Sequence, residues 1–262
     1  SAALLELPKG YRMLIDGGGF SNNAIFDIGK NVVAPFLWHR KIGKLDAVVL
    51  SHPDADHLNG LLYIIRHFSV DRVLSTHQPA DSESYQQFLR LIASGDISHP
   101  DFSQLPRHLP INGASLHILH PAPHSPCIHE GRDRNNCSLV LKACLGKSSI
   151  LFAGDIMAAA ETKLARKQKA KLGANVLIAP HHGSKTSSTT QFLDCVHPGA
   201  AIFSAGPHNR FHLPAAEVLK RYRNRECRIL VTSSDGAVRI ETNGRRIELA
   251  PECGKALEIK TG

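Results

Sequence analysis

The chain has 262 residues with 42% apolar and 21% charged side chains, a composition that excludes disordered and fibrous proteins and predicts one large globular domain over residues 1–262. Lysine and arginine outnumber aspartate and glutamate by 31 to 23, so we expect attraction to polyanions or to an anionic membrane. The six cysteines include no Cys-x-x-Cys pair, which argues against a zinc ribbon or a thioredoxin-type site and leaves the redox compartment open.

The first half of the chain predicts strands that alternate with helices. Apolar runs predict strands, and apolar residues at helical spacing predict helices. The expected strands cover residues 2–5, 11–16, 45–51 and 116–119, and the expected helices cover residues 58–68 and 81–94. Because an apolar stretch stands so close to residue 1, we expect that a first strand lies upstream of this sequence.

The second half repeats one local theme, in which an apolar strand ends in a polar or glycine-rich turn. These segments cover residues 148–155, 176–184 and 200–206, with helices expected over 157–171 and 214–223. Residues 228–249 contain the turn residues of a meander of strands. Strands that both alternate with helices and form hairpins favour two sheets with helices outside over a single parallel sheet.

The most informative segment is His-Pro-Asp-Ala-Asp-His, which begins at His52. It places four potential metal ligands in six residues between an apolar strand and a helix. Ligands at alternating positions converge on one point, while Asp56 and His57 can turn towards a second ion, so the spacing suits a two-metal centre. The alternative is a polar loop in which Asp54 or Asp56 caps the helix and the histidines are solvated.

Two further strand ends carry potential ligands, Asp155 and the pair His181 and His182. An open sheet places its ligand site at such ends, so we expect these side chains to join the His52–His57 segment. A Gly-Asp turn alone is a common structural feature, and only the combination argues for a metal. Asp16 also follows a strand, and we expect it to orient a ligand and not to bind metal itself.

The order of these motifs resembles the metallo-β-lactamase superfamily. Leu-Ile-Asp-Gly-Gly, His-Pro-Asp-Ala-Asp-His, Asn-Asn-Cys-Ser-Leu-Val-Leu, Phe-Ala-Gly-Asp and Pro-His-His-Gly-Ser follow one another over about residues 2–245. Within the superfamily the sequence is most similar to the C-terminal domain of ComEC-type competence DNA-uptake proteins, where Asp also follows the first motif His.

The resemblance implies an α/β fold, the four-layer αββα sandwich of two mixed β-sheets flanked by helices, with two divalent ions at the edge of the sheets. Residue by residue, His52 and Asp54 would hold the first ion, Asp56 and His57 the second, and Asp155 would bridge them. His182 would complete the second site, and His181 would contact phosphate or donate a proton. The catalytic residues that we expect are Asp56, His181 and His212.

The sequence departs from the family at two places. Most members supply a third histidine to the first ion from the middle of the chain, where this sequence has Asn135, Asn136 and Ser138; we expect Asn136 and Ser138 to support the ligands. In the family's Gly-x-x-Asn-x-x-x-His-Pro segment, Leu213 stands at the histidine position and His212 lies one residue earlier. The residues expected to contact substrate are Ser184, Lys185, Asn209 and Arg210.

The ligand types predict the ions and the substrate. Oxygen-rich sites without thiolates favour harder ions, so we expect activity with Mn²⁺, Mg²⁺ as a further candidate, and Zn²⁺ as an ion that also binds. Three aspartates leave about one positive charge in excess on two divalent ions, which suits an anionic phosphodiester. With only 6% aromatic residues, we expect contact with the DNA backbone and no sequence-specific readout.

The resemblance to the ComEC-type proteins implies a metal-dependent nuclease domain that acts on DNA during natural transformation and degrades the strand that is not transported. The resemblance further implies a soluble domain of a bacterial inner-membrane protein, whose membrane channel domain is the partner, without a nucleotide cofactor. Two alternatives remain open. One is a small-molecule hydrolase of thioesters, lactones or lactams with the same fold, and the other is a non-catalytic DNA-binding module.

Overall fold

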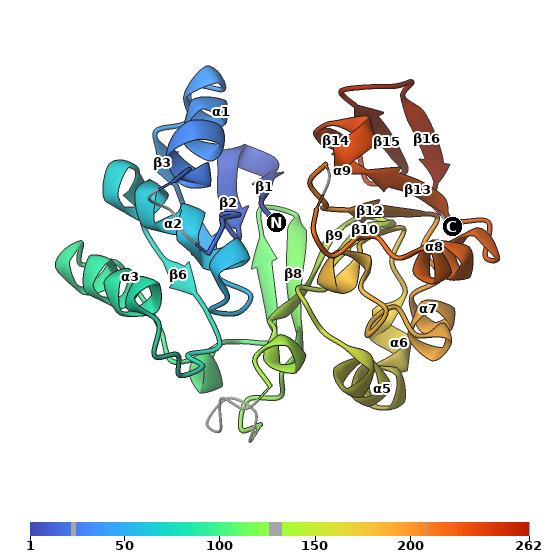
Figure 1. The fold of residues 1–262 in the computed structure, drawn as a ribbon, viewed down its shortest axis with the longest axis horizontal. Coiled ribbons are helices and arrows are strands. Elements are labelled where there is room, and N and C mark those ends of the chain that lie inside the picture. The colour runs from blue at the N-terminus through green and yellow to red at the C-terminus, as the bar shows by residue number, and fades with distance from the viewer. Residues whose placement is uncertain (22–24, 126–132, 208, 262) are drawn as a thin grey trace. The chain divides into compact units, whose positions relative to one another are not determined.

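The computed structural model describes residues 1–21, 25–125, 133–207 and 209–261 (Figure 1). Its contacts divide the chain into two compact units. Unit 1 comprises residues 1–106 and 121–139, and unit 2 comprises residues 107–120 and 140–262. The expectation of a single domain over the whole chain stays a prediction.

Unit 1 is built on a mixed four-stranded sheet of order β1-β2-β4-β6. Strands β1 and β2 pair antiparallel, whereas β2, β4 and β6 are parallel. These strands are β1 (Ala3–Leu7), β2 (Tyr11–Ile15), β4 (Ala47–Val49) and β6 (Val73–Leu74), and the short pair β3 (Lys44–Leu45) and β5 (Ser69–Val70) lies beside them in the sequence. The central strand β4 is buried at all three positions, as expected of a parallel strand covered on both faces.

The helices of unit 1 supply its core. They are the turn η1 (Pro8–Gly10), the π-helical turn η2 (Gly29–Val33), which runs on into α1 (Ala34–His39), then α2 (Ala55–His67), α3 (Glu83–Ser94), η3 (Phe102–Gln104) and η4 (Asn135–Cys137). Leu37 of α1, Leu61 of α2 and Phe88 of α3 pack with Val48 of β4 in one apolar cluster. The apolar face of α2 thus fixes its first turn against the sheet.

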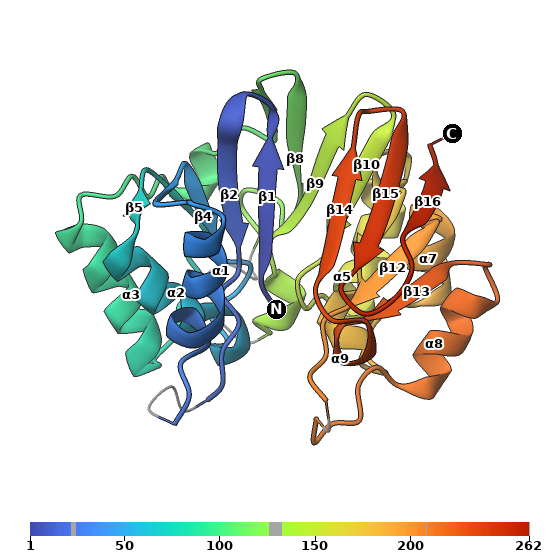
Figure 2. The ribbon, with the colours of Figure 1, turned by 90° about the horizontal axis from the view of Figure 1, so that it is seen from above.

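Unit 2 is built on a mixed seven-stranded sheet of order β13-β12-β11-β10-β9-β8-β7. Strands β10 to β13 are parallel and β7 to β10 antiparallel. The strands are β7 (His108–Ile111), β8 (Ala114–His120), β9 (Val140–Leu145), β10 (Ser148–Phe152), β11 (Val176–Ile178), β12 (Ala200–Phe203) and β13 (Arg228–Val231). A separate antiparallel sheet joins β14 (Val238–Thr242), β15 (Arg246–Pro251) and β16 (Leu257–Lys260), as Figure 2 shows.

The two faces of the seven-stranded sheet pack against different layers. Alternate residues of β12 divide between two clusters: Phe203 packs with Tyr222 and the helices, whereas Ile202 packs with Leu249 of the three-stranded sheet. This alternation follows from the period of two in a strand. The helical elements of unit 2 are α5 (Ala158–Lys167), α6 (Lys169–Leu172), η5 (Pro180–Gly183), α7 (Thr190–Val196), α8 (Ala216–Arg223) and α9 (Thr232–Asp235).

The α/β class with mixed sheets and flanking helices is confirmed. The meander over 228–249 is wrong in part, because β13 joins the seven-stranded sheet parallel to β12, whereas β14 and β15 pair antiparallel in the separate sheet. Helix η2–α1 and strand β9 were not expected. Helix α1 exposes Phe36 and Trp38 on its surface, so its sequence lacks the amphipathic pattern that signals a surface helix.

Candidate functional site

The His52–His57 segment joins β4 to α2 in unit 1. Helix α2 begins at Ala55, and Asp54 precedes it with extended backbone angles but no capping bond from its side chain. Both His52 and His57 are 1% exposed. The alternative of a capping Asp54 with solvated histidines is therefore wrong, since the imidazoles are buried and the carboxylate does not cap.

Hydrogen bonds from Asp16 and Ser51 orient both imidazoles. Asp16 Oδ2 accepts a bond from His57 Nδ1 at 2.7 Å, and Asp16 also accepts from the Ser51 amide and hydroxyl, both at 2.8 Å. Ser51 Oγ lies 3.0 Å from His52 Nδ1. With the serine hydroxyl donating to Asp16, its oxygen accepts from His52 Nδ1. Both histidines are then held in the tautomer whose Nε2 carries the lone pair that binds a cation.

The buried Asp16 is held as a carboxylate. Burial alone raises the pKa of Asp16, but the interactions with His57 and Ser51 outweigh it and hold the pKa below its ordinary value. Asp16 itself has a left-handed backbone, with φ of 56°, a strained conformation of the kind that is concentrated at functional sites. The hydrogen bond between Asp16 Oδ2 and His57 Nδ1 is the contact that the expected orienting role requires.

Each imidazole of this segment also lies near a carboxylate. His52 Nε2 is 3.7 Å from Asp54 Oδ2, and His57 Nε2 is 3.7 Å from Asp56 Oδ2. These distances exceed a hydrogen bond and approach the about 3.4 Å that separates two ligand atoms bonded to one tetrahedral ion at ~2.1 Å. Arg134, which the sequence did not single out, donates from Nε to Asp54 Oδ1 at 2.8 Å.

The Asn135–Ser138 segment lies beside the same loop. The Leu139 amide donates to Ser51 O at 2.8 Å, and Gln78 Nε2 donates to Cys137 O at 2.7 Å. Asn136 bonds the Asp133 carboxylate through its side chain at 2.6 Å, whereas Ser138 is fully buried. The supporting roles of Asn136 and Ser138 stay predictions. The hydrogen bond from the Leu139 amide to Ser51 O connects their segment to the start of the His52–His57 segment.

In unit 2, Asp155 follows β10, and His181 and His182 follow β11. Both histidines have left-handed backbones with φ of 49° and 54°, and Gly183 continues at 81°. Such a run is strained for residues with side chains. The His181 amide donates to Gly154 O at 3.1 Å, so the turn after β11 is tied to the turn after β10. These two strands are neighbours in the sheet.

The paired histidines of unit 2 have different surroundings. His182 Nδ1 donates to Ser204 O at 2.8 Å, beyond the end of β12, and its Nε2 lies 3.4 Å from Asp155 Oδ2. His181 Nε2 is 3.9 Å from the same oxygen, and its Nδ1 contacts Thr186 Oγ1 at 3.3 Å. His182 is thus the nearer of the two to Asp155, and the roles of His182 as a ligand and of His181 as a proton donor stay predictions.

A buried carboxylate that the sequence did not signal supports the paired histidines. Glu161 of α5 is completely buried and accepts backbone N–H bonds from Ser188 at 2.5 Å and Thr189 at 2.7 Å. In the same turn, Ser187 donates its hydroxyl to Pro180 O at 2.8 Å. Burial raises the pKa of Glu161 although these hydrogen bonds oppose the shift. The chain after His182 is therefore tied into the interior of unit 2.

The remaining expected residues lie in exposed turns of unit 2. Asn209 uses its amide to close its own loop, since Nδ2 donates to Leu213 O at 2.8 Å and Oδ1 accepts from Leu213 N at 2.8 Å. Arg210 stacks over the ring of Phe211, 4.6 Å from its centroid. The same turns contain Ser184, Lys185 and His212. Ser184 Oγ lies 3.0 Å from Thr186 Oγ1. Their roles towards substrate stay predictions.

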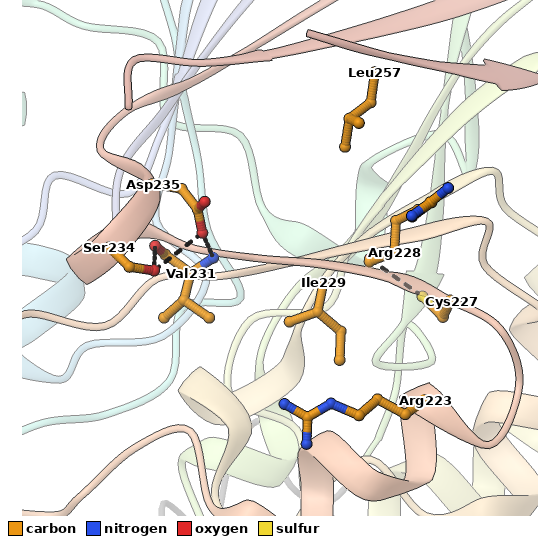
Figure 3. A pocket seen from close by; sticks show the side chains of 8 residues that line it. All are labelled: Arg223, Cys227, Arg228, Ile229, Val231, Ser234, Asp235 and Leu257. Atoms are coloured by element: carbon orange, nitrogen blue, oxygen red, sulfur yellow. Dashed lines mark hydrogen bonds between the residues drawn. The ribbon is translucent and has the colours of Figure 1, made fainter. Parts of the chain in front are cut away.

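A pocket of about 430 Å³ lies elsewhere in unit 2, around β13 and α9 (Figure 3). Arg223 and Arg228 line it together with Asp235, whose carboxylate accepts from the Val231 amide at 2.6 Å. It contains none of the expected ligands. The expected ligands therefore lie at the strand ends and not in this pocket.

Comparisons with known proteins give the chain relatives. Residues 1–208 match the family model of the metallo-beta-lactamase superfamily. The chain is 29% identical over 248 residues to ComE operon protein 3 of Bacillus subtilis, with 89% of this chain and 30% of that protein covered. It is 28% identical over 230 residues to competence protein ComA of Neisseria gonorrhoeae, with 83% of this chain and 29% of that protein covered.

A solved structure supports the fold. The metallo hydrolase Igni18 of Ignicoccus hospitalis superposes with a TM-score of 0.52 at 13% identity, over 99% of this chain and 94% of that one. The chain spans less than a third of the length of ComE operon protein 3 and of competence protein ComA. Among the residues that the structure describes, none of the helices has the length and apolar character that crossing a bilayer requires.

Proposed function

Because the chain belongs to the metallo-β-lactamase superfamily, we propose that it is a metal-dependent nuclease domain that acts on DNA during DNA uptake. The similarity to competence protein ComA supports DNA as the substrate, and the excess of basic residues favours a polyanion. The observation that carries the proposal is the arrangement of His52, His57 and His182. In each of them Nδ1 makes a hydrogen bond within the protein, and Nε2 lies 3.4–3.7 Å from an aspartate oxygen.

We propose that two divalent ions bind at the expected ligands. His52 and Asp54 would hold the first ion, and Asp56, His57 and His182 the second, with Asp155 between them. Imidazoles and carboxylates without thiolates suit Mn²⁺, Zn²⁺ or Mg²⁺, and Asp56, His57, Asp155 and His182 are donors able to hold a metal. Two such ions supply an activated water and offset charge on phosphoryl oxygens.

The chain's own residues would orient the phosphodiester and move a proton. His181, whose Nδ1 contacts Thr186 Oγ1, would protonate the leaving oxygen, a role that an imidazole can fill near neutral pH. His212 is the second candidate for that role. Lys185 and Arg210 are exposed cations next to motif residues and would contact the DNA backbone.

Cleavage assays on the purified chain test this function. Labelled single- and double-stranded DNA is incubated with EDTA, Mn²⁺, Mg²⁺ or Zn²⁺, using wild type, Asp56→Ala and the control Asp81→Ala. Asp81 is an exposed carboxylate before α3. We expect cleavage with Mn²⁺ by wild type and Asp81→Ala, and none with EDTA or by Asp56→Ala. Equal cleavage by Asp56→Ala overturns the ligand assignment, and strict dependence on Zn²⁺ overturns the preference for Mn²⁺.

The alternatives predict different results in the same assay. Hydrolysis of a thioester or lactam without DNA cleavage indicates a small-molecule hydrolase. Binding without cleavage under every condition indicates a DNA-binding module, and the Arg134–Asp54 ion pair favours that reading if it excludes an ion from Asp54. Attachment to a membrane channel domain in a bacterial inner-membrane protein is proposed from the competence relatives, which are more than three times as long as the matched regions.

A further inference from the structure

Exposed apolar side chains are concentrated in one short stretch of unit 1. Six of the large apolar side chains that are exposed among the described residues lie between positions 20 and 38, and Phe211 lies in unit 2. Phe20 is 55% and Phe26 43% exposed, although both are aromatic. Exposing aromatic rings to water is unfavourable, and clusters of such rings mark binding surfaces.

The backbone before Phe20 is fixed against the first turns of α2. Gly17 N donates to His57 O at 2.7 Å, and Gly60 N donates to Gly18 O at 2.8 Å. Gly19 lies so close to α2 that a Cβ there would come within 2.3 Å of Ala55 O. The segment that carries Phe20 is therefore held on the same helix that carries the ligands Asp56 and His57.

A side-chain bond completes this attachment. Asn59, buried in α2, donates from Nδ2 to Phe20 O at 2.6 Å. Phe26 meets Phe20 edge to face, with ring centroids 6.5 Å apart and ring planes at 64°. In this arrangement the edge of one ring covers the face of the other only in part. Phe20 is thus anchored through its backbone, and the pair of rings leaves surface for a planar ligand.

We propose that Phe20 and Phe26 form a stacking platform for the unpaired bases of single-stranded DNA, beside the proposed metal ligands of unit 1. The inference deepens the proposed nuclease function and rests on DNA being its substrate. Bases in a duplex already stack on each other, so only unpaired bases offer a face to an aromatic ring. Because the two ring planes are inclined at 64°, one base cannot stack in parallel on both rings. One phenylalanine therefore dominates, and Phe20, anchored by Asn59, is that residue.

Binding measurements in EDTA test the platform without cleavage. The full chain is titrated into three labelled DNAs, and fluorescence anisotropy reports binding. The DNAs are a single strand, a hairpin duplex that contains the same sequence, and an abasic strand with the same number of phosphates. We expect Phe20→Ala to weaken binding of the normal single strand by roughly fivefold to a hundredfold, and to change duplex and abasic binding less than twofold. Phe20→Tyr should retain binding, because its ring stacks equally, whereas Phe20→Leu should not.

Matched controls distinguish base stacking from a general loss of exposed apolar surface. Phe36→Ala removes an aromatic ring of similar exposure from α1 and should leave all three affinities unchanged. Circular dichroism checks that each variant folds. Equal losses on normal and abasic strands, retention by Phe20→Leu, or failure of wild type to bind single strands each overturn the platform. Binding to vesicles of phosphatidylglycerol that Phe20→Ala abolishes, with DNA binding unchanged, would assign the rings to a membrane instead.

The outcome is distinct from that of the nuclease proposal. If wild type cleaves no DNA with any metal but still shows the Phe20-dependent preference for unpaired bases, the nuclease function fails and the platform stands. If DNA is cleaved with Mn²⁺ and Phe20→Ala binds all three DNAs like wild type, the platform fails and the nuclease stands.

Discussion

Substitution of Gly60 by alanine separates two opposing effects in helix α2. Alanine is favoured over glycine inside a helix by about 1 kcal/mol. However, a Cβ at position 60 would lie 1.9 Å from Gly17 O, where an ordinary contact requires at least 3.4 Å. The neighbour is backbone and cannot rotate away, so the segment that carries Asp16 and Phe20 must move by roughly 1.5 Å.

That movement determines how much the free energy of unfolding falls in Gly60→Ala. It breaks the bonds from Gly17 N to His57 O and from Gly60 N to Gly18 O, each of which contributes about 1 kcal/mol, and overpacking adds about 1–3 kcal/mol. After subtraction of the gain in helix propensity, we expect Gly60→Ala to lower the free energy of unfolding by about 2–4 kcal/mol. The displaced Asp16 should also weaken its hold on His57.

Urea unfolding followed by circular dichroism measures the change. Gly43→Ala is the matched control, because Gly43 has an ordinary backbone and open space around its Cβ position, and it should leave stability unchanged or slightly higher. If Gly60→Ala is as stable as Gly43→Ala, the close approach of residues 17–19 to α2 does not exist in solution.

Three further substitutions probe the buried polar groups. Glu161→Gln should cost about 2–3 kcal/mol of unfolding free energy, because the single oxygen of Gln can accept from only one of the amides of Ser188 and Thr189 and its NH2 group would face the other. A loss below ~0.5 kcal/mol in urea unfolding contradicts this. Asp16→Asn should weaken Mn²⁺ binding in calorimetry about 10- to 100-fold, with unchanged affinity as the contrary result. Burial, and next the charge of a neighbouring histidine, lower the pKa of His99 to about 4. His99 thus binds its proton more weakly when folded, so stability should fall as pH drops from about 6.5 to about 4, by about 2 kcal/mol after discounting for its partial exposure. His99→Gln should flatten that part of the pH profile, and an unchanged profile would show that another group is responsible.

The positions of the candidate ligand segments at strand ends could be predicted from the sequence because the residues before them form apolar strands. Val48 and Leu177 mark strands that end just before polar turns, and strand ends position side chains by simple geometry. Asp16 could be assigned an orienting role for the same reason. The roles of these residues in metal binding remain to be measured.

Other features could not be predicted because their partners are backbone atoms or distant strands. Glu161 lies in a helix rich in lysine and arginine and resembles a surface residue, yet it binds amides of residues 188 and 189. Strand β13 has the same alternation as a hairpin strand, and alternation does not reveal which sheet a strand joins. Helix α1 escaped notice because Phe36 and Trp38 are apolar on its outer side.

The parallel pairing of β10, β11 and β12 has a consequence for how the polar groups at the strand ends of unit 2 are spaced. Asp155, His182 and the carbonyl of Ser204 each follow one of these adjacent strands, which the ladder holds about 4.8 Å apart. The backbone hydrogen bonds of the sheet therefore fix the distance between these strand ends. The loops beyond these strands can therefore change in sequence while the spacing between the strand ends stays the same.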